Sequence, residues 1–360
     1  MTRMKDESEA SITKGLAWLV AQQAADGGWH SKAYGQLKDG ASVTALAVYA
    51  ISHAREKDKL TPEESAAVTK GFDFLRRGLA KRGTIASPDG SLDFPTYAAA
   101  LWLEATLRMA RNDERAKVID YLVQAQVAEP RGFESSSASY GGWDFLGPAD
   151  AQGITTGTNV SVTCFVLEAL AAEQASGGRK PTEAMETALV RGKAYALRCQ
   201  QPDGGFAFTC EPASLNNKAA FLDEKLTQPR SYGSATCDGI RALVACGMKA
   251  ADEPVAKALA WLVKRTGLEV VPGFETLPPE AGWQRGLRYY YYASLARALA
   301  HFAASDREVR RAALAKHIVS LQKSDGSWQN ESDRMRENDP LIATPLALLA
   351  LAAAGAVDPS

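Results

Sequence analysis

The stretch Gln23-Ala-Ala-Asp-Gly-Gly-Trp29 recurs along the chain as Gln200-Gln-Pro-Asp-Gly-Gly-Phe206 and Gln322-Lys-Ser-Asp-Gly-Ser-Trp328. Each copy follows a segment whose apolar residues have helical spacing, and its Asp-Gly step is a turn signal. We therefore expect each copy to end one helix, to fold its aromatic side chain back onto that helix, and to lead into a second, Ala/Leu-rich helix. Such a repeat predicts stacked helical hairpins.

Three weaker copies lie between the full ones, at Pro88-Asp-Gly-Ser-Leu-Asp-Phe94, from Gln126 to Phe133, and at Pro272-Gly-Phe274. Together the six copies predict six hairpins, which fill the chain from about Lys14 to Ala354. No length is left for a second domain. The sequence therefore predicts one domain over residues 1–360.

The six second helices share one register. Their reference positions are Thr44, Ala99, Thr163, Thr236, Tyr292 and Thr344. Six residues further on, every helix carries an alanine: Ala50, Ala105, Ala169, Ala242, Ala298 and Ala350. A small residue at one fixed place indicates that each helix closely approaches a neighbour there. The positions four and seven after the reference are almost all apolar, so we expect them to contact the first helix of the same pair.

Another face of these helices is polar and differs from repeat to repeat. It comprises the positions two before, two after and five after the reference, which form one stripe on a helix. A face that varies while its neighbours stay uniform is expected to line a central lumen. The sequence therefore predicts an all-α fold, an (α/α)6 toroid with six outer and six inner helices.

The Q-x-x-D-G-x-W/F motifs ahead of these helices resemble the repeats of squalene–hopene-type terpenoid cyclases and protein prenyltransferase β-subunits. The resemblance covers nearly the whole chain. It implies an (α/α)6 barrel with a cavity that opens at the N-terminal ends of the inner helices. It also implies an apolar, isoprenoid-type ligand.

Neither family's catalytic signature is present. The cyclases begin their reaction with a D-x-D-D-T motif, whose best match here, Asn159-Val-Ser-Val-Thr163, lacks all three acids. The prenyltransferases hold zinc through Asp, Cys and His at the starts of inner helices. No such ligand occupies those positions, because Cys164 and Cys237 lie one residue past the reference. We therefore expect neither a metal nor a cofactor.

Charged residues segregate on the polar face. Glu104 and Glu168 share one position in repeats two and three, and Arg241 and Arg297 occupy it in repeats four and five. Two interpretations stay open: a buried ion-pair network that plugs the narrow end of the barrel, or an acid/base or anion-binding site. Asp238, one turn nearer the opening, is the best acid candidate. We expect Arg241 to hold it ionised.

Any chemistry is expected at the mouth of the barrel, around Asp238. The candidate catalytic residues lie on or beside the polar face: Asp238, Arg241, Tyr97 and Ser161. Long loops precede inner helices three, four and five, and loops of this length are usually functional. Residues from the polar face, the helix starts and these loops are the candidate ligand contacts: Asn159, Phe165, Tyr232, Trp283, Arg288, Tyr289 and Tyr290.

Composition limits the classes of partner. The chain has 360 residues and a net charge of −1, from 41 basic and 42 acidic residues, which argues against a nucleic-acid partner. No apolar run is long enough for a membrane span, no secretory signal is visible, and five Cys without a C-x-x-C motif are typical of the cytoplasm.

Three functions stay open at this point. The first is an enzyme that acts on an apolar, isoprenoid-type substrate with a non-standard acid. The second is a non-catalytic toroid that binds an apolar small molecule or a partner protein. The third is a carbohydrate-active enzyme, because other (α/α)6 barrels are lyases or hydrolases. A wide apolar lumen favours the first two, and a groove with paired carboxylates favours the third.

Overall fold

The computed structural model describes residues 2–82, 93–111, 114–147, 157–178, 180–211, 218–265 and 267–355. Within these ranges the secondary structure is helical, apart from two isolated β-bridges. The inner helices are α2 (Ala41–Ala54), α4 (Pro95–Arg108), α6 (Val160–Ala175), α8 (Gly233–Ala245), α11 (Arg288–Ala298) and α13 (Pro340–Gly355). The outer helices are α1 (Thr2–Ala21), α3 (Pro62–Arg82), α5 (Arg115–Gln124), α7 (Glu183–Arg198), α9 (Glu253–Val263) and α12 (Ala304–Ser320).

Short helical segments complete the description. Helix α10 (Trp283–Gly286) lies in the loop before α11. The 3-10 turns are Gly35–Leu37, Lys57–Lys59, Glu129–Arg131, Pro279–Ala281 and Leu299–His301.

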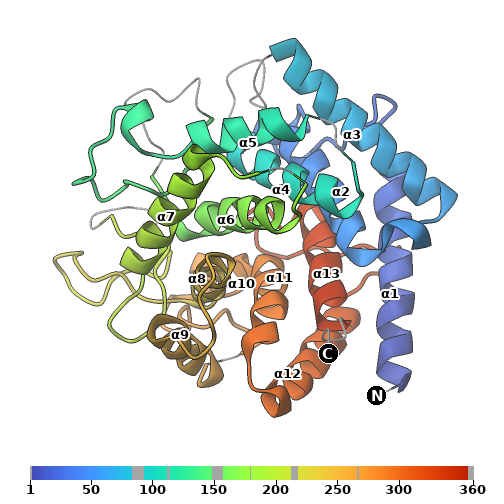
Figure 1. The fold of residues 1–360 in the computed structure, drawn as a ribbon. Helices are drawn as coiled ribbons and strands as arrows, with labels where there is room; N and C mark the ends of the chain where they lie inside the picture. Colours follow the sequence, from blue (N-terminus) through green and yellow to red (C-terminus); the bar gives the residue numbers. More distant parts are fainter. Residues whose placement is uncertain are drawn as a thin grey trace.

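The inner helices form a closed ring. Each contacts the next in the order α2, α4, α6, α8, α11 and α13, and α13 returns to contact α2. Figure 1 shows the first outer helix, α1, beside α13, so the two ends of the helical array meet. The predicted all-α toroid of six hairpins is confirmed.

The alanine column lies at the helix contacts, as predicted. All six alanines are fully buried: Ala50, Ala105, Ala169, Ala242, Ala298 and Ala350. A larger side chain at any of these positions would push neighbouring inner helices apart.

The pairing of outer and inner helices differs from the prediction. Helix α3 packs against α2, α5 against α4, and α9 against α8, so these outer helices contact the inner helix of the preceding pair. Gly71 shows how closely α3 approaches α2, because a Cβ atom at this position would lie 2.6 Å from Cγ2 of Val48 in α2. In these three repeats the apolar face therefore contacts the next outer helix along the chain, whereas α7 and α12 also contact the inner helix of their own pair, as predicted.

The first motif copy works as a set of hydrogen bonds. The Trp29 indole N–H donates to the carbonyl of Leu19 in the helix just ended, over 2.8 Å, as predicted. The Trp29 backbone N–H donates to Thr44 Oγ1, over 2.9 Å, which explains the Thr at the reference position. The Gln23 amide donates to the carbonyl of Ala67 in α3, over 2.9 Å.

The last copy closes the ring. The Trp328 indole donates to the carbonyl of Ile318 over 2.8 Å, as Trp29 does to its own helix. The Gln322 amide donates to the carbonyl of Ser11 in α1, over 2.9 Å, and the Ser11 hydroxyl donates back to Gln322 Oε1, over 2.7 Å. The same motif that joins neighbouring hairpins therefore joins the last hairpin to the first.

The third copy was predicted in the wrong place. Its aromatic residue is Trp143, not Phe133, because the Trp143 indole donates to the carbonyl of Leu122 over 2.7 Å. Gln126 is the matching glutamine, and its amide donates to the carbonyl of Ala188 over 2.9 Å. The chain between Gln126 and Trp143 is an insertion within the motif.

Part of the second copy, residues 88–92, lies outside the described residues. Its Asp93 accepts a hydrogen bond from the backbone N–H of Ala41 over 2.7 Å at the start of α2. Burial raises the pKa of Asp93 to about 6.

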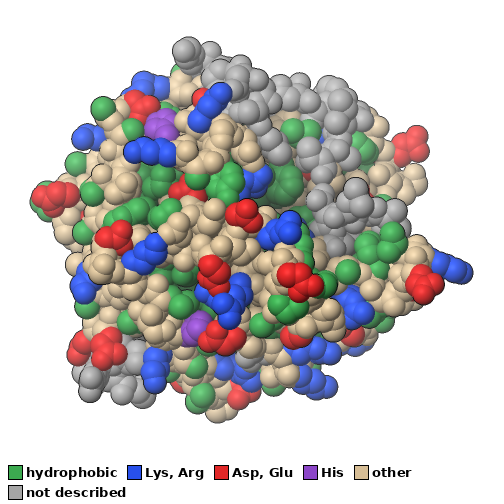
Figure 2. Space-filling model, turned by 180° about the vertical axis from the view of Figure 1, so that it is seen from behind, with side chains coloured by type: hydrophobic (Ala, Val, Ile, Leu, Met, Phe, Trp, Pro, Cys, Tyr) green, Lys and Arg blue, Asp and Glu red, His purple; other side chains and the backbone are tan. Residues whose placement is uncertain are grey.

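The surface mixes both signs of charge. Figure 2 shows acidic and basic side chains interspersed over one face of the molecule. None of the described helices combines the length and the apolar character that a bilayer crossing requires.

Candidate active site

A cavity of about 770 Å³ occupies the lumen. The first turns of the inner helices form its wall through Ser42, Leu46, Tyr97, Leu101, Ser161, Phe165, Ser234, Tyr290, Ile342 and Leu346. These residues come from the polar face predicted to line the lumen. Loops that lead into the same helix ends complete the wall, so the cavity lies at the N-terminal ends of the inner helices.

Aromatic rings cover much of this wall. The Phe165 ring lies 5.5 Å from the Tyr97 ring and 6.4 Å from the Tyr290 ring, measured between centroids. The loops add five aromatic residues: Phe94, Phe145, Phe208, Tyr232 and Trp283. These rings give an apolar ligand a large contact area.

Asp238 is the centre of a hydroxyl cluster behind this wall. It is fully buried and accepts hydrogen bonds from Ser161 Oγ over 2.7 Å and from Tyr290 OH over 2.8 Å. Arg241 Nη1 donates to it over 2.9 Å, and the Ser294 hydroxyl is a fourth donor. Asp238 is absent from the cavity wall, so only Ser161 and Tyr290 connect it to the lumen.

The pKa of Asp238 shifts in the direction opposite to the one expected from its pairing with Arg241. Burial raises the pKa of its carboxyl group, and the Arg241 guanidinium and three hydroxyl donors offset only part of that rise. We had expected the attraction of Arg241 to exceed the cost of burial. Complete exclusion of water makes desolvation the larger effect.

The charges deeper in the barrel form the predicted ion-pair network. Arg241 Nε donates to Glu168 over 3.0 Å, and Arg297 Nη2 lies 3.1 Å from Glu168 and 3.9 Å from Glu104. His53 stands 3.8 Å from Glu104, and burial lowers the pKa of its imidazole. The network lies beyond the cavity wall, which favours the structural interpretation of these charges.

The structure separates the predicted site residues into two groups. Those on the cavity wall are Tyr97, Ser161, Phe165, Tyr232, Trp283 and Tyr290. Those away from the wall are Asp238, Arg241, Asn159, Arg288 and Tyr289. Three of the four candidate catalytic residues do meet, because Ser161 and Arg241 both donate to the carboxyl group of Asp238, while Tyr97 lies on the cavity wall.

Three predicted ligand contacts have structural partners instead. Asn159 caps α6, where its side chain accepts from the backbone N–H of Val162 over 2.9 Å. Arg288 pairs with Glu331 over 3.2 Å. Tyr289 precedes Tyr290 by one residue, so its side chain leaves the helix in another direction, and its hydroxyl donates to the carbonyl of Gln329 over 3.5 Å.

Four charged wall residues were missed: Lys218, Arg334, Arg336 and Glu337. Glu337 accepts from the backbone N–H groups of Tyr289 over 3.0 Å and Tyr290 over 2.8 Å, so it caps α11. Burial raises the pKa of Glu337 to about 7. For Arg334, Arg336 and Glu337 the available signal was Arg334-Met-Arg-Glu337 just ahead of inner helix six, whereas the prediction covered the loops before inner helices three, four and five. Lys218 lies in the second of these loops.

Metal ligands do not cluster in the described ranges. There, no three side chains of His, Cys, Asp or Glu gather closely enough to hold an ion.

The fold is shared with known structures of both enzyme classes considered above. The type II terpene cyclase MstE from Scytonema, in complex with its product merosterolic acid A, is 15% identical, and the match covers 99% of each chain at a TM-score of 0.61. A glycosidase is also 15% identical, over 99% of this chain and 98% of its own, at a TM-score of 0.57. The Lin0763 protein from Listeria innocua is 14% identical over 96% of both chains, at a TM-score of 0.60.

No protein-family model and no curated protein matches the chain. At the identities given, the structural likeness shows the fold alone.

Proposed function

We propose that this protein binds an apolar, isoprenoid-type ligand in the lumen of a terpenoid cyclase-like toroid. The observation that carries the proposal is the cavity of about 770 Å³ with its aromatic and aliphatic wall. That volume falls within the range of small-molecule sites. The full-length likeness in fold to a type II terpene cyclase supports the same function.

A carbohydrate-active function has less support. Glycoside hydrolysis generally needs two carboxyl groups on either side of the bond to be cleaved. Among the described residues, the cavity wall carries one carboxyl group, that of Glu337. Its oxygens accept hydrogen bonds from two backbone N–H groups and the Asn330 amide, so it already serves to hold α11 and its loop.

An acid-initiated reaction of the apolar ligand is a second candidate. It is favoured by the raised pKa of Asp238 and by the 2.8 Å hydrogen bond between Tyr290 OH and Asp238. In such a reaction the Tyr290 hydroxyl, which lies on the cavity wall, would give its proton to the ligand, and its hydrogen bond with a protonated Asp238 would have to reverse direction so that Asp238 replaces that proton. Tyr290→Phe would then abolish product formation from geranylgeraniol, measured by gas chromatography and mass spectrometry.

The binding proposal is tested with geranylgeraniol, a neutral C20 isoprenoid alcohol. Leu346→Trp should weaken binding at least about tenfold, because the larger ring fills the lumen wall of α13. Val190→Trp adds the same ring at a position on α7 that is 69% exposed, and should leave the dissociation constant unchanged. Equal dissociation constants for the two variants, or binding of maltotriose instead of geranylgeraniol, would contradict the proposal.

A further inference from the structure

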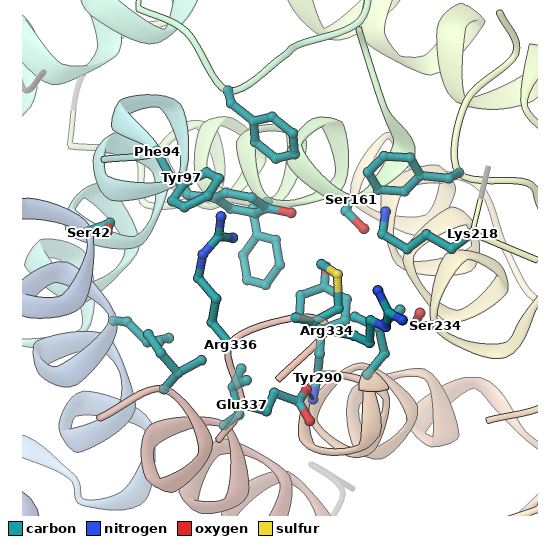
Figure 3. A pocket seen from close by; sticks show the side chains of 18 of the residues that line it. Ser42, Phe94, Tyr97, Ser161, Lys218, Ser234, Tyr290, Arg334, Arg336 and Glu337 are labelled. Carbon is teal, nitrogen blue, oxygen red and sulfur yellow. Dashed lines mark hydrogen bonds between the residues drawn. The ribbon is translucent and has the colours of Figure 1, made fainter. Parts of the chain in front are cut away.

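Three cations on the cavity wall have no acidic partner among the described residues. They are Lys218, in the loop before α8, and Arg334 and Arg336, in the loop before α13. Figure 3 shows the side chains of Lys218 and Arg336 reaching into the open pocket from different sides, with the Arg334 guanidinium at its edge near Ser234. Arg241, a fully buried cation of the barrel, is paired with Glu168 and Asp238, whereas Lys218 and Arg336 are half-buried and Arg334 is exposed.

Neutral groups, not carboxylates, contact these cations: an aromatic ring lies beside each one, and Arg334 Nε also donates to the carbonyl of Ala281 over 2.7 Å. The Lys218 amine lies 3.2 Å from the centroid of the Phe208 ring. The Arg336 guanidinium lies 5.3 Å from the Phe94 ring, and the Arg334 guanidinium lies 5.8 Å from the Trp283 ring. Such contacts orient a cation but leave its charge uncompensated.

Glu337, the one acid on the described wall, does not compensate them. No ion pair joins it to Lys218, Arg334 or Arg336, and its carboxyl group is engaged with the start of α11. A wall with three cations and one engaged acid carries an excess of positive charge. A charge that is partly removed from water is costly unless a partner neutralises it, and this applies to the half-buried Lys218 and Arg336.

We propose that the ligand is an amphiphile: its apolar chain fills the lumen, and an anionic group, a carboxylate or a phosphate, binds to Lys218, Arg334 and Arg336. This inference rests on the proposed function, because it adds a head group to the same ligand. Guanidinium groups form paired hydrogen bonds with carboxylate and phosphate oxygens, so both anions fit the same cations.

Lys218 makes the site responsive to an anion. Burial lowers the pKa of its amine to about 7. An anion bound beside the amine favours the charged form and raises that pKa. Binding of the anionic ligand near pH 7 is therefore accompanied by proton uptake at Lys218.

The test compares three probes that share the same geranylgeranyl hydrocarbon chain and differ in the head group: geranylgeraniol, geranylgeranoic acid and geranylgeranyl monophosphate. The wild-type protein should bind at least one anionic probe about tenfold or more tightly than the alcohol. The tighter anionic probe identifies the head group. The preference should shrink as ionic strength rises from about 0.05 to 0.5 M.

Arg336→Gln and Lys218→Met should each reduce the ratio of anion affinity to alcohol affinity at least about fivefold. Lys257→Gln, an exposed cation on α9, is the matched control and should keep the ratio of the wild type. Equal affinity of the wild type for all three probes would overturn the anionic head group while leaving the proposed function in place. Failure of every probe to bind would overturn both.

Discussion

At the scale of single residues, burial decides the chemistry of the acids. Asp238 and Glu337 both have raised pKa values because they are removed from water, although each accepts several hydrogen bonds. Asp238 is paired with Arg241, whereas Glu337 is held by backbone N–H groups. The two acids therefore give separate predictions.

Asp238→Asn should lower the free energy of unfolding by about 1–3 kcal/mol, because the amide cannot accept from all four donors that surround the carboxyl group. Urea denaturation at pH 7 measures the change. Asp120→Asn, on the exposed face of α5, should stay within about 0.5 kcal/mol of the wild type. Equal stability of the two variants would show that Asp238 has no structural role.

Glu337→Gln should change how stability depends on pH. Folding raises the pKa of Glu337 from 4.5 to about 7, so the folded state binds more protons than the unfolded state between these values. The contribution of Glu337 is therefore fully present below about pH 4.5 and is lost as the pH rises through about 7. The Glu337→Gln variant has no carboxyl group at this position, so its stability lacks this dependence on pH.

The stability of the wild type relative to Glu337→Gln should fall between pH 5 and pH 7, by at most about 1.4 kcal/mol per pH unit. Urea denaturation of both proteins across this range measures it. A difference that stays constant, or that grows with pH, would exclude a raised pKa at Glu337.

At the scale of helices and loops, the repeated motif joins each hairpin to its neighbours. The indole, the glutamine amide and the reference Thr all form backbone hydrogen bonds at Trp29 and again at Trp328. These partners follow from local spacing, so the helices and their register could be predicted. The third copy of the motif could not be predicted correctly, because an insertion separates its glutamine, Gln126, from its aromatic residue, Trp143.

Gln322→Ala tests the closure between α1 and the last hairpin. The substitution removes the hydrogen bonds that Gln322 shares with Ser11 and with the Gly326 carbonyl, so stability should fall by about 1–3 kcal/mol. Gln228→Ala changes an exposed glutamine and should have little effect. Thermal unfolding followed by circular dichroism compares them, and indistinguishable midpoints would refute the role assigned to Gln322.

At the scale of the whole molecule, the ring turns six similar helices into one varied wall. The helical register placed Tyr97, Ser161, Phe165 and Tyr290 on this wall correctly, because position on a helix fixes the direction of a side chain. The helical register could not place Lys218 or Arg336, because both lie in long loops, where the direction of a side chain does not repeat regularly along the sequence. The depth of Asp238 was also hidden, because it depends on how neighbouring helices cover it.

The central claim is that the lumen holds an apolar chain, and photolabelling tests it most directly. A geranylgeraniol analogue with a diazirine near the end of its chain would be irradiated on the protein, and the labelled peptides mapped by mass spectrometry. We predict labelling of wall residues such as Phe165 in α6 and Leu346 in α13, suppressed by excess unlabelled geranylgeraniol. Labelling confined to the outer helices, or unaffected by competitor, would contradict the account.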